Sequence, residues 1–192
     1  KLLLDMIGDV VESSRLEAGL VTVQAEPFQL IDQLQELETS LAIPIVSRGG
    51  ELTFERDENL QPWLVGDSEK LGQIVRKTVL VTSRLNPQGI IRVSIGQAVS
   101  QAGDCQLNIV VEDSSLVLDQ TEAEALFEPF SQGQRWGGSG LELAIAGHYA
   151  TLLGGSLTGL ALSPGLRWTI QIRARLDRSD RPASPPAAGQ VV

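Results

Sequence analysis

Two neighbouring stretches in the middle of the chain alternate between apolar and polar residues, and they constrain the fold more than any other feature. The first runs from Ile91 to Ile95 and the second from Leu107 to Val111. A period of two is typical of β-strands, and the polar, glycine-containing stretch between them predicts a hairpin loop. At least part of the sheet is therefore predicted to be antiparallel.

Apolar residues at helical spacing mark other parts of the chain. Helical and alternating stretches follow one another without clean β–α–β units. We therefore predict an α/β two-layer sandwich, with a mixed, largely antiparallel sheet and helices on one face. Asp67 or Ser68 is placed to cap one of these helices. The predicted helices cover residues 2–15, 30–43, 68–85, 122–127 and 141–153, and the predicted strands cover 21–25, 51–56, 63–65, 91–95, 107–111, 157–161 and 168–174.

Composition excludes several classes of function. The net charge of −9 gives the chain no general attraction for nucleic acid or anionic lipid. With one cysteine, Cys105, and one histidine, His148, an ordinary zinc site is not expected. Cys105 lies in an apolar alternating stretch and is interpreted as a buried strand thiol. The sequence has no apolar run long enough to span a bilayer and no signal peptide.

The two ends of the chain suggest a piece of a longer protein. The first helix begins without a cap, and its apolar stripe needs a partner helix. From Asp177 onward the sequence is rich in Pro, Ala, Ser and Arg, and we predict a disordered linker. The stripe consists of Leu3, Ile7, Val10 and Val11.

Five short motifs resemble, in sequence and in order, those of the sensor histidine kinases of bacterial two-component systems. Residues 14–19 (SRLEAG) resemble the exit of the second dimerisation helix, and 26–30 (EPFQL) resemble the start of the catalytic domain. Residues 66–74 resemble the start of the N-box helix, 126–132 the F box, and 137–145 the G2 box. The resemblance covers about residues 2–176, and this family shares its ATPase fold with gyrase and Hsp90-type chaperones.

The resemblance implies a Bergerat-type ATPase domain over residues 20–176. Residues 1–19 would be the end of the second dimerisation and phosphotransfer helix, and 177–192 a linker or tail. The family carries its phosphoacceptor histidine on the first dimerisation helix, which is not in this chain, so no catalytic residue is expected here. His148 is interpreted as a structural or surface residue.

Part of the family's nucleotide site is recognisable. Asp113 ends a predicted strand where the family has its adenine-binding aspartate. Gly138, Ser139 and Gly140 match the G2 box, whose glycines let backbone N–H groups approach phosphate. Lys77 and Arg84 lie on the N-box helix and could attract phosphate, or they could be ordinary solvated charges. These six residues are the predicted vestigial nucleotide site.

Other positions depart from the family's pattern. Val81 stands where the family has an asparagine that holds magnesium, and its side chain has no oxygen to offer a hard cation. Ser115 and Val117 replace two glycines after the aspartate. Glu142 replaces a glycine of the G2 box, where a carboxylate suits the helix dipole but repels a triphosphate. The segment between the F and G2 boxes, 132–136, is short for the family's lid.

These departures favour a degenerate domain, a pseudokinase that has little or no ATP binding and acts through protein–protein contacts in a phosphorelay. Its partner would be a second copy or another sensor kinase, joined through the dimerisation helices, as in hybrid sensors of the RetS type. The alternatives are a divergent but active ATP-dependent autokinase and, less favoured, a gyrase- or chaperone-like ATPase. We expect no bound cofactor and no metal in the degenerate case, and ATP with magnesium only in the active one.

The resemblance also implies a setting. The chain would be the cytoplasmic domain of an inner-membrane bacterial protein, attached to the membrane only through parts outside this sequence. A receiver domain is a further expected partner, and nucleic acid is not.

Overall fold

The computed structural model describes residues 2–130 and 138–179, without the side chains of Leu2, Leu3 and Asp5. Its strands form one mixed sheet, in the order β1-β3-β7-β5-β4-β2, and β6 also pairs with β7. The β2–β4 pair is parallel and the other pairs are antiparallel. The strands are β1 (Glu26–Gln29), β2 (Glu51–Arg56), β3 (Trp63–Gly66), β4 (Ile90–Val99), β5 (Asp104–Asp113), β6 (Ser156–Leu162) and β7 (Gly165–Leu176).

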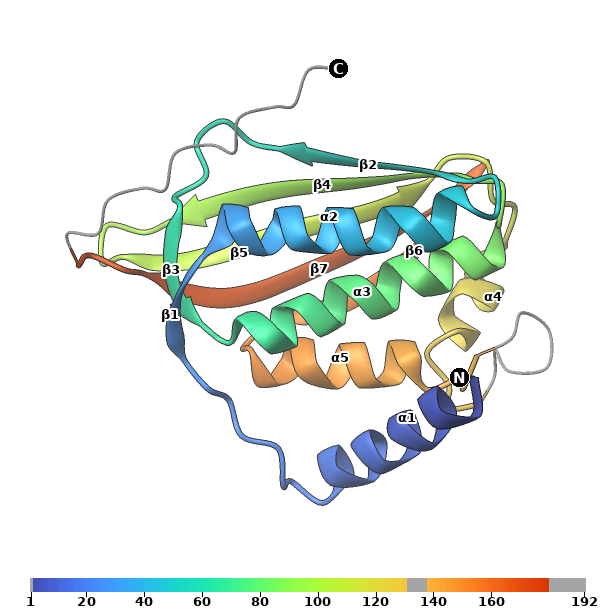
Figure 1. Cartoon of the computed structure of the whole chain (residues 1–192), viewed down its shortest axis with the longest axis horizontal. Coiled ribbons are helices and arrows are strands. Elements are labelled where there is room, and N and C mark those ends of the chain that lie inside the picture. The colour runs from blue at the N-terminus through green and yellow to red at the C-terminus, as the bar shows by residue number, and fades with distance from the viewer. Residues whose placement is uncertain (1, 131–137, 180–192) are drawn as a thin grey trace.

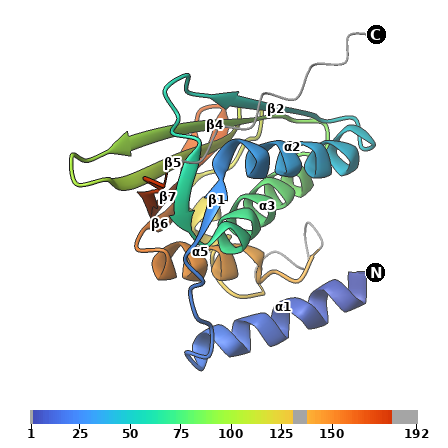
Figure 2. The same cartoon turned by 60° about the vertical axis from the view of Figure 1, so that its left-hand side comes forward.

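Three helices cover one face of this sheet (Figure 1). They are α2 (Leu30–Val46), α3 (Ser68–Leu85) and α5 (Glu142–Leu152), and the short α4 (Gln120–Ala125) lies near the end of α3. The N-terminal helix α1 (Leu2–Glu17) lies outside this layer, next to α5, as the turned view in Figure 2 also shows. The predicted two-layer fold, with a mixed and mostly antiparallel sheet, is confirmed.

The core lies between the sheet and these helices. One face of α2 is buried because its leucines recur every three or four residues. The β4–β5 hairpin buries the alternating residues from which it was predicted. Trp168 of β7 is fully buried, and its indole N–H donates to the Thr82 hydroxyl of α3 at 2.9 Å. Burying side chains of this size stabilises the fold by about 1.5–3 kcal/mol each. The packing of α2 and α3 on the sheet therefore fixes the positions of the other elements.

The Asp67 cap of α3 is confirmed: its carboxylate accepts from the Lys70 N–H at 3.0 Å. Burial alone would raise the pKa of Asp67. Hydrogen bonds from Lys70 and the Gln24 N–H, with the charge of Lys70, outweigh burial and hold this pKa below its usual value.

Two predicted elements need correction. The strand predicted over residues 21–25 is wrong, because this segment is irregular and hydrogen-bonds through Gln24 to an aspartate side chain. The strand β1 begins one residue later, and Pro27 is tolerated in it because β1 is an edge strand. The short helix lies two residues earlier than predicted, since Asp119 forms a capping box with Glu122.

The division into residues 1–19, 20–176 and 177–192 stays a prediction. Most of the predicted linker lies outside the described residues. Among the described residues, no helix combines the length and the apolar character needed to cross a membrane.

Candidate functional site

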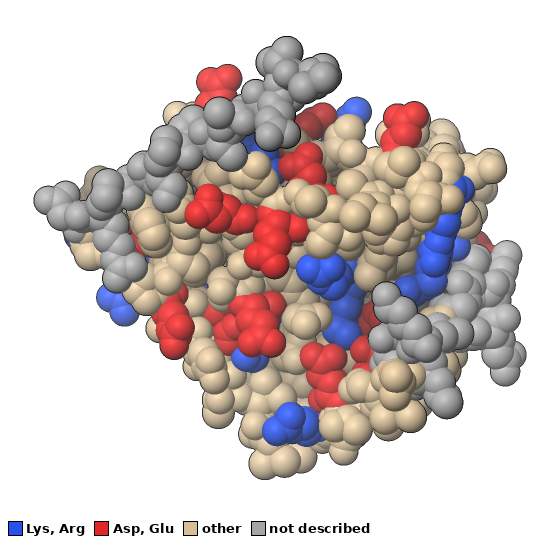
Figure 3. All heavy atoms as spheres, viewed as in Figure 1, with Lys and Arg blue, Asp and Glu red and all other residues tan. Residues whose placement is uncertain are grey.

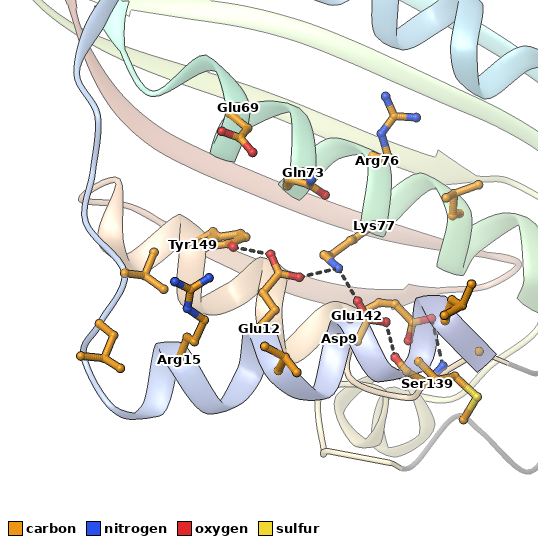
Figure 4. Close-up of a pocket in the computed structure, with 18 of the residues that line it drawn as sticks. Asp9, Glu12, Arg15, Glu69, Gln73, Arg76, Lys77, Ser139, Glu142 and Tyr149 are labelled. Carbon is orange, nitrogen blue, oxygen red and sulfur yellow. Dashed lines mark hydrogen bonds and ion pairs between the residues drawn. The ribbon is translucent and has the colours of Figure 1, made fainter. Parts of the chain in front are cut away.

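A cavity of about 950 Å³ lies between α1, α3 and the start of α5 (Figure 4). Six of the predicted site residues line it: Lys77, Arg84, Gly138, Ser139, Glu142 and, from the predicted interaction stripe, Val11. The α3 residues among them face the cavity because they recur at helical spacing along one side of that helix. Acidic and basic side chains lie close together over this region, as Figure 3 shows, with basic groups over α3 and acidic groups between α3 and α1. The cavity is therefore highly charged.

Lys77 points from α3 towards α1. Its ammonium group lies 2.7 Å from an Asp9 carboxylate oxygen and 3.1 Å from a Glu12 oxygen (Figure 4). Burial alone would lower the pKa of Lys77, but the two carboxylates outweigh it and raise this pKa above its usual value. Lys77 is thus a fixed positive charge that the protein itself already neutralises.

Glu142 is the first residue of α5, which begins one residue later than predicted. Its carboxylate pairs with the Arg84 guanidinium at 2.7 Å and accepts weakly from the Ser139 N–H at 3.3 Å. Gly138 has a φ of 98°, and a Cβ built there would lie 2.5 Å from the same carboxylate oxygen. The carboxylate therefore occupies the backbone amide and the helix end where a phosphate would otherwise be stabilised.

The predicted magnesium position does not fit a magnesium ion. Val81 is 1% exposed and offers only carbon, and Lys77, one turn away, brings a positive charge. A hard divalent cation requires oxygen ligands, and neither side chain provides one. Among the described residues there is also no group of three His, Cys, Asp or Glu side chains that could hold a metal.

Asp113 does not line the cavity. It ends β5 as predicted, but it is fully buried and both of its carboxylate oxygens are bonded. One oxygen accepts from the Ser115 N–H at 2.8 Å, the Ser115 hydroxyl at 2.9 Å and the Leu116 N–H at 3.0 Å. The other accepts from the Asn86 side-chain amide at 3.0 Å. A Cβ at Gly89 would lie only 2.0 Å from that second oxygen, so the carboxylate is closely surrounded.

The loop after Asp113 has lost the glycine character of the family. Ser115 and Val117 are exposed, Val117 by 81%. Among the described residues, Phe130 is the one non-glycine residue with a positive φ, so both loop residues have backbone angles that any side chain tolerates. Leu116 fastens this loop to the sheet, because its carbonyl accepts from the Gly165 N–H at 2.8 Å. The loop is held by the protein's own contacts.

In the described part of the chain, a hydrogen bond joins the F box to the G2 box. The Phe130 N–H donates to the Gly140 carbonyl at 3.0 Å, and the φ of Phe130 is 66°. Gly140 also has a positive φ, of 72°, which favours glycine there. The short segment predicted at 132–136 lies outside the described residues.

The predicted interaction stripe of α1 is about half exposed where the structure describes it, and Val11 also lines the cavity. Ile7, Val10 and Val11 are 53%, 49% and 52% exposed, and the Leu3 side chain lies outside the described part. A partner helix against this stripe stays a prediction. The opposite face carries Asp9 and Glu12, which sequence reasoning did not single out as site residues. Their spacing of three residues, opposite an apolar stripe, was the available signal.

Outside the cavity, two further predictions are met. His148 is exposed, as expected for a surface residue. Cys105 is buried, and desolvation raises the pKa of its thiol despite a hydrogen bond from the Gln97 amide.

Comparison with known proteins agrees with this architecture. The profile of the histidine kinase-, DNA gyrase B-, and HSP90-like ATPase family matches residues 66–178. The chain is 31% identical over 202 aligned residues to the sensor histidine kinase GacS of Pseudomonas protegens, with 99% of this chain and 22% of GacS covered. It is 28% identical over 161 residues to the histidine-protein kinase BarA of Escherichia coli K12, with 81% of this chain and 18% of BarA covered. The chain thus spans about a fifth of these relatives.

Solved structures share the fold. Full-length ShkA in complex with AMPPNP superimposes with a TM-score of 0.77 at 19% identity, over 91% of this chain and 36% of ShkA. The histidine kinase AdeS of Acinetobacter baumannii gives a TM-score of 0.69 at 17% identity, over 86% of this chain and 75% of that one. The chain therefore belongs to the histidine kinase-, DNA gyrase B- and HSP90-like ATPase family, as a catalytic domain of the type found in two-component sensor kinases.

Proposed function

We propose that this domain has little or no affinity for Mg-ATP and acts in a two-component phosphorelay through protein–protein contacts. One observation carries the proposal: the groups that would hold the nucleotide are bonded to other groups of the same chain. Asp113 is enclosed by its own loop and Asn86, and the Lys77 and Arg84 charges are neutralised by carboxylates. A nucleotide would have to break these contacts before making its own.

The size of the effect follows from three losses. There is no oxygen ligand for magnesium at Val81, a carboxylate lies at the phosphate end at Glu142, and the Asp113 carboxylate is already bonded. If each change costs about 1–2 kcal/mol, the order expected for lost charge-assisted contacts, together they weaken binding by roughly a thousandfold or more. A micromolar site would become millimolar.

Calorimetric titration with ATP in millimolar magnesium tests this proposal. We expect no saturation below about millimolar ATP, on the estimate above. A variant that restores the family's residues, Lys77→Asn with Val81→Asn and Glu142→Gly, is the matched comparison and should bind more tightly than the wild type. Wild-type binding at about ten micromolar or below would contradict the proposal, since it would require all three losses to be offset.

The partner in this proposal is a second copy of the chain or another sensor kinase, held through the exposed stripe of α1. A hybrid sensor of the RetS type would work in this way, and a receiver domain is a further partner. The support is the exposure of Ile7, Val10 and Val11 on a helix that the resemblance assigns to dimerisation. Sedimentation of the full-length protein, compared with an Ile7→Glu/Val11→Glu variant, should give a dimer for the wild type alone. A monomeric wild type at micromolar concentration would contradict this part of the proposal.

An active autokinase is the second candidate. It is supported by the names of the relatives, which are histidine kinases, and by the AMPPNP in the structure of ShkA. Gly138, Ser139 and Gly140 are also retained. Incubation of a longer form of the protein, which includes the upstream dimerisation helix, with γ-labelled ATP and magnesium separates the candidates: acid-labile label on that protein supports the active kinase. In either case, we propose that the chain is the cytoplasmic part of a bacterial inner-membrane sensor.

A further inference from the structure

Two carboxylates of α1 form charged contacts with groups that line the cavity. Asp9 lies 2.7 Å from the Lys77 ammonium, and its other oxygen accepts from the Ser139 hydroxyl at 2.5 Å. Glu12 lies 3.1 Å from Lys77 and accepts a short hydrogen bond from the Tyr149 hydroxyl. Figure 4 shows both acidic side chains pointing from α1 towards these groups. Lys77 comes from α3, and the two hydroxyls come from the loop before α5 and from α5 itself.

We propose that Asp9 and Glu12 act as an internal anion that fastens α1 to the catalytic domain, and that phosphate-bearing anions compete with α1 for Lys77. We call the contact of these two carboxylates with Lys77, Ser139 and Tyr149 the α1 clasp. The proposal does not rest on the loss of Mg-ATP binding, because it concerns metal-free anions.

Charge and burial explain why the clasp and an anion exclude each other. The side chains of Lys77 and Asp9 are 11% and 14% exposed, and that of Glu12 is 25% exposed. A charge at this depth is stable only beside an opposite charge, since an unpaired buried charge loses its hydration without compensation. If α1 leaves, Lys77 loses both carboxylate partners, and an anion can take their place. Arg84 cannot replace the carboxylates beside Lys77, because Arg84 is itself a cation and is paired with Glu142.

The donors that hold α1 are also suited to phosphate. An ammonium group and two hydroxyls converge on the two carboxylates, and each of them can donate to a phosphate oxygen instead. The cavity of about 950 Å³ beside them is large enough for a small polyphosphate and is also lined by Arg76 and Arg15. The α1 carboxylates and a phosphate-bearing anion would use the same donors, so they cannot occupy the site together.

The clasp also fixes which way α1 faces. In an α-helix, residues three apart share a face, and Asp9 and Glu12 lie opposite Ile7. When the acidic face is held on the domain, Ile7 and Val10 of the apolar stripe are 53% and 49% exposed to solvent. Displacement of the clasp by an anion would release the helix and with it the fixed orientation of the stripe relative to the catalytic domain.

Hydrogen–deuterium exchange of the whole chain, with inorganic triphosphate in EDTA as the probe, tests the competition. Triphosphate should speed exchange of the backbone amides of α1 in the wild type and leave α2 unchanged. In Asp9→Asn/Glu12→Gln, we expect α1 to exchange at least tenfold faster without any ligand, and triphosphate to bind at least tenfold more tightly by calorimetry. The control Glu17→Gln/Glu36→Gln removes the same charge from exposed positions and should behave as the wild type.

Lys77→Gln provides a second variant that does not alter α1. It should release α1 to a similar degree and should lose the response to triphosphate, and adding Asp9→Asn/Glu12→Gln to it should release α1 no further. The proposal is overturned if triphosphate binds the wild type and Asp9→Asn/Glu12→Gln equally or binds neither at ten millimolar, on the scale of a weak anion site. It is also overturned if triphosphate saturates the wild type without changing the exchange of α1. This last arm needs no variant, so it holds even if a substitution prevents folding.

Discussion

Replacing Asp113 by alanine should destabilise the ligand-free domain strongly, because this carboxylate holds the loop that follows β5. It accepts hydrogen bonds from two backbone amides, a hydroxyl and the Asn86 amide, and it is fully buried. A hydrogen bond to a charged group contributes about 1.5–3 kcal/mol, and a buried donor left unpaired costs about 1–3 kcal/mol. With partial relaxation and entry of water, we expect the free energy of unfolding to fall by about 3–5 kcal/mol.

Urea unfolding followed by tryptophan fluorescence, without nucleotide, measures this change. Asp104→Asn is the control, because Asp104 is an exposed carboxylate at the other end of the same strand, and it should stay within about 0.5 kcal/mol of the wild type. If Asp113→Ala unfolds within about 1 kcal/mol of the wild type, on the same scale of surface substitutions, the carboxylate is not structural. The position of Asp113, which resembles that of the family's adenine-binding aspartate, would then point to adenine binding.

Three further substitutions test other contacts. The pKa of Asp67 is lowered in the folded state, because the hydrogen bonds from Lys70 and Gln24 and the charge of Lys70 outweigh its burial. Asp67 therefore stabilises the fold at a pH above its unfolded pKa of 3.8, and this stabilisation is lost as the pH falls through the lower folded pKa. Asp67→Asn should therefore destabilise the domain at pH 7, and its difference from the wild type should shrink as urea unfolding is repeated below pH 4. Gly147→Ala should raise stability by about 0.5–1 kcal/mol, because Gly147 lies inside α5 and a Cβ there meets nothing within 4 Å. Gly155→Ala should instead lower the free energy of unfolding by more than about 2 kcal/mol, because its Cβ would lie 1.8 Å from a backbone carbonyl oxygen of β7. The thermal midpoint should fall accordingly.

The fold was largely predictable because its strongest patterns are local. The leucines of α2 recur with the helical period and are the residues that become buried, so the pattern and the packing carry the same information. The irregular segment 21–25 was mistaken for a strand because alternation alone does not reveal whether a neighbouring strand exists. That segment is held by a side chain 43 residues away, at Asp67, which no local pattern reveals.

The site was predictable in position but not in bonding. The end of β5 and the start of α5 fix where Asp113 and Glu142 lie, and the motif order identified both. Which group bonds each carboxylate depends on residues far away in sequence, such as Asn86, 27 residues before Asp113. For the same reason Lys77 could be interpreted as a solvated charge: its partner Asp9 is 68 residues away, on a helix whose direction the sequence does not specify.

The hydrogen bond between Phe130 and Gly140 holds together two positions on either side of residues 131–137. The free-energy cost of joining two positions of a flexible chain grows only with the logarithm of the number of residues between them, by about 0.6 kcal/mol for each doubling. We therefore expect a change in the number of residues between Phe130 and Gly140 to alter the stability of the domain very little.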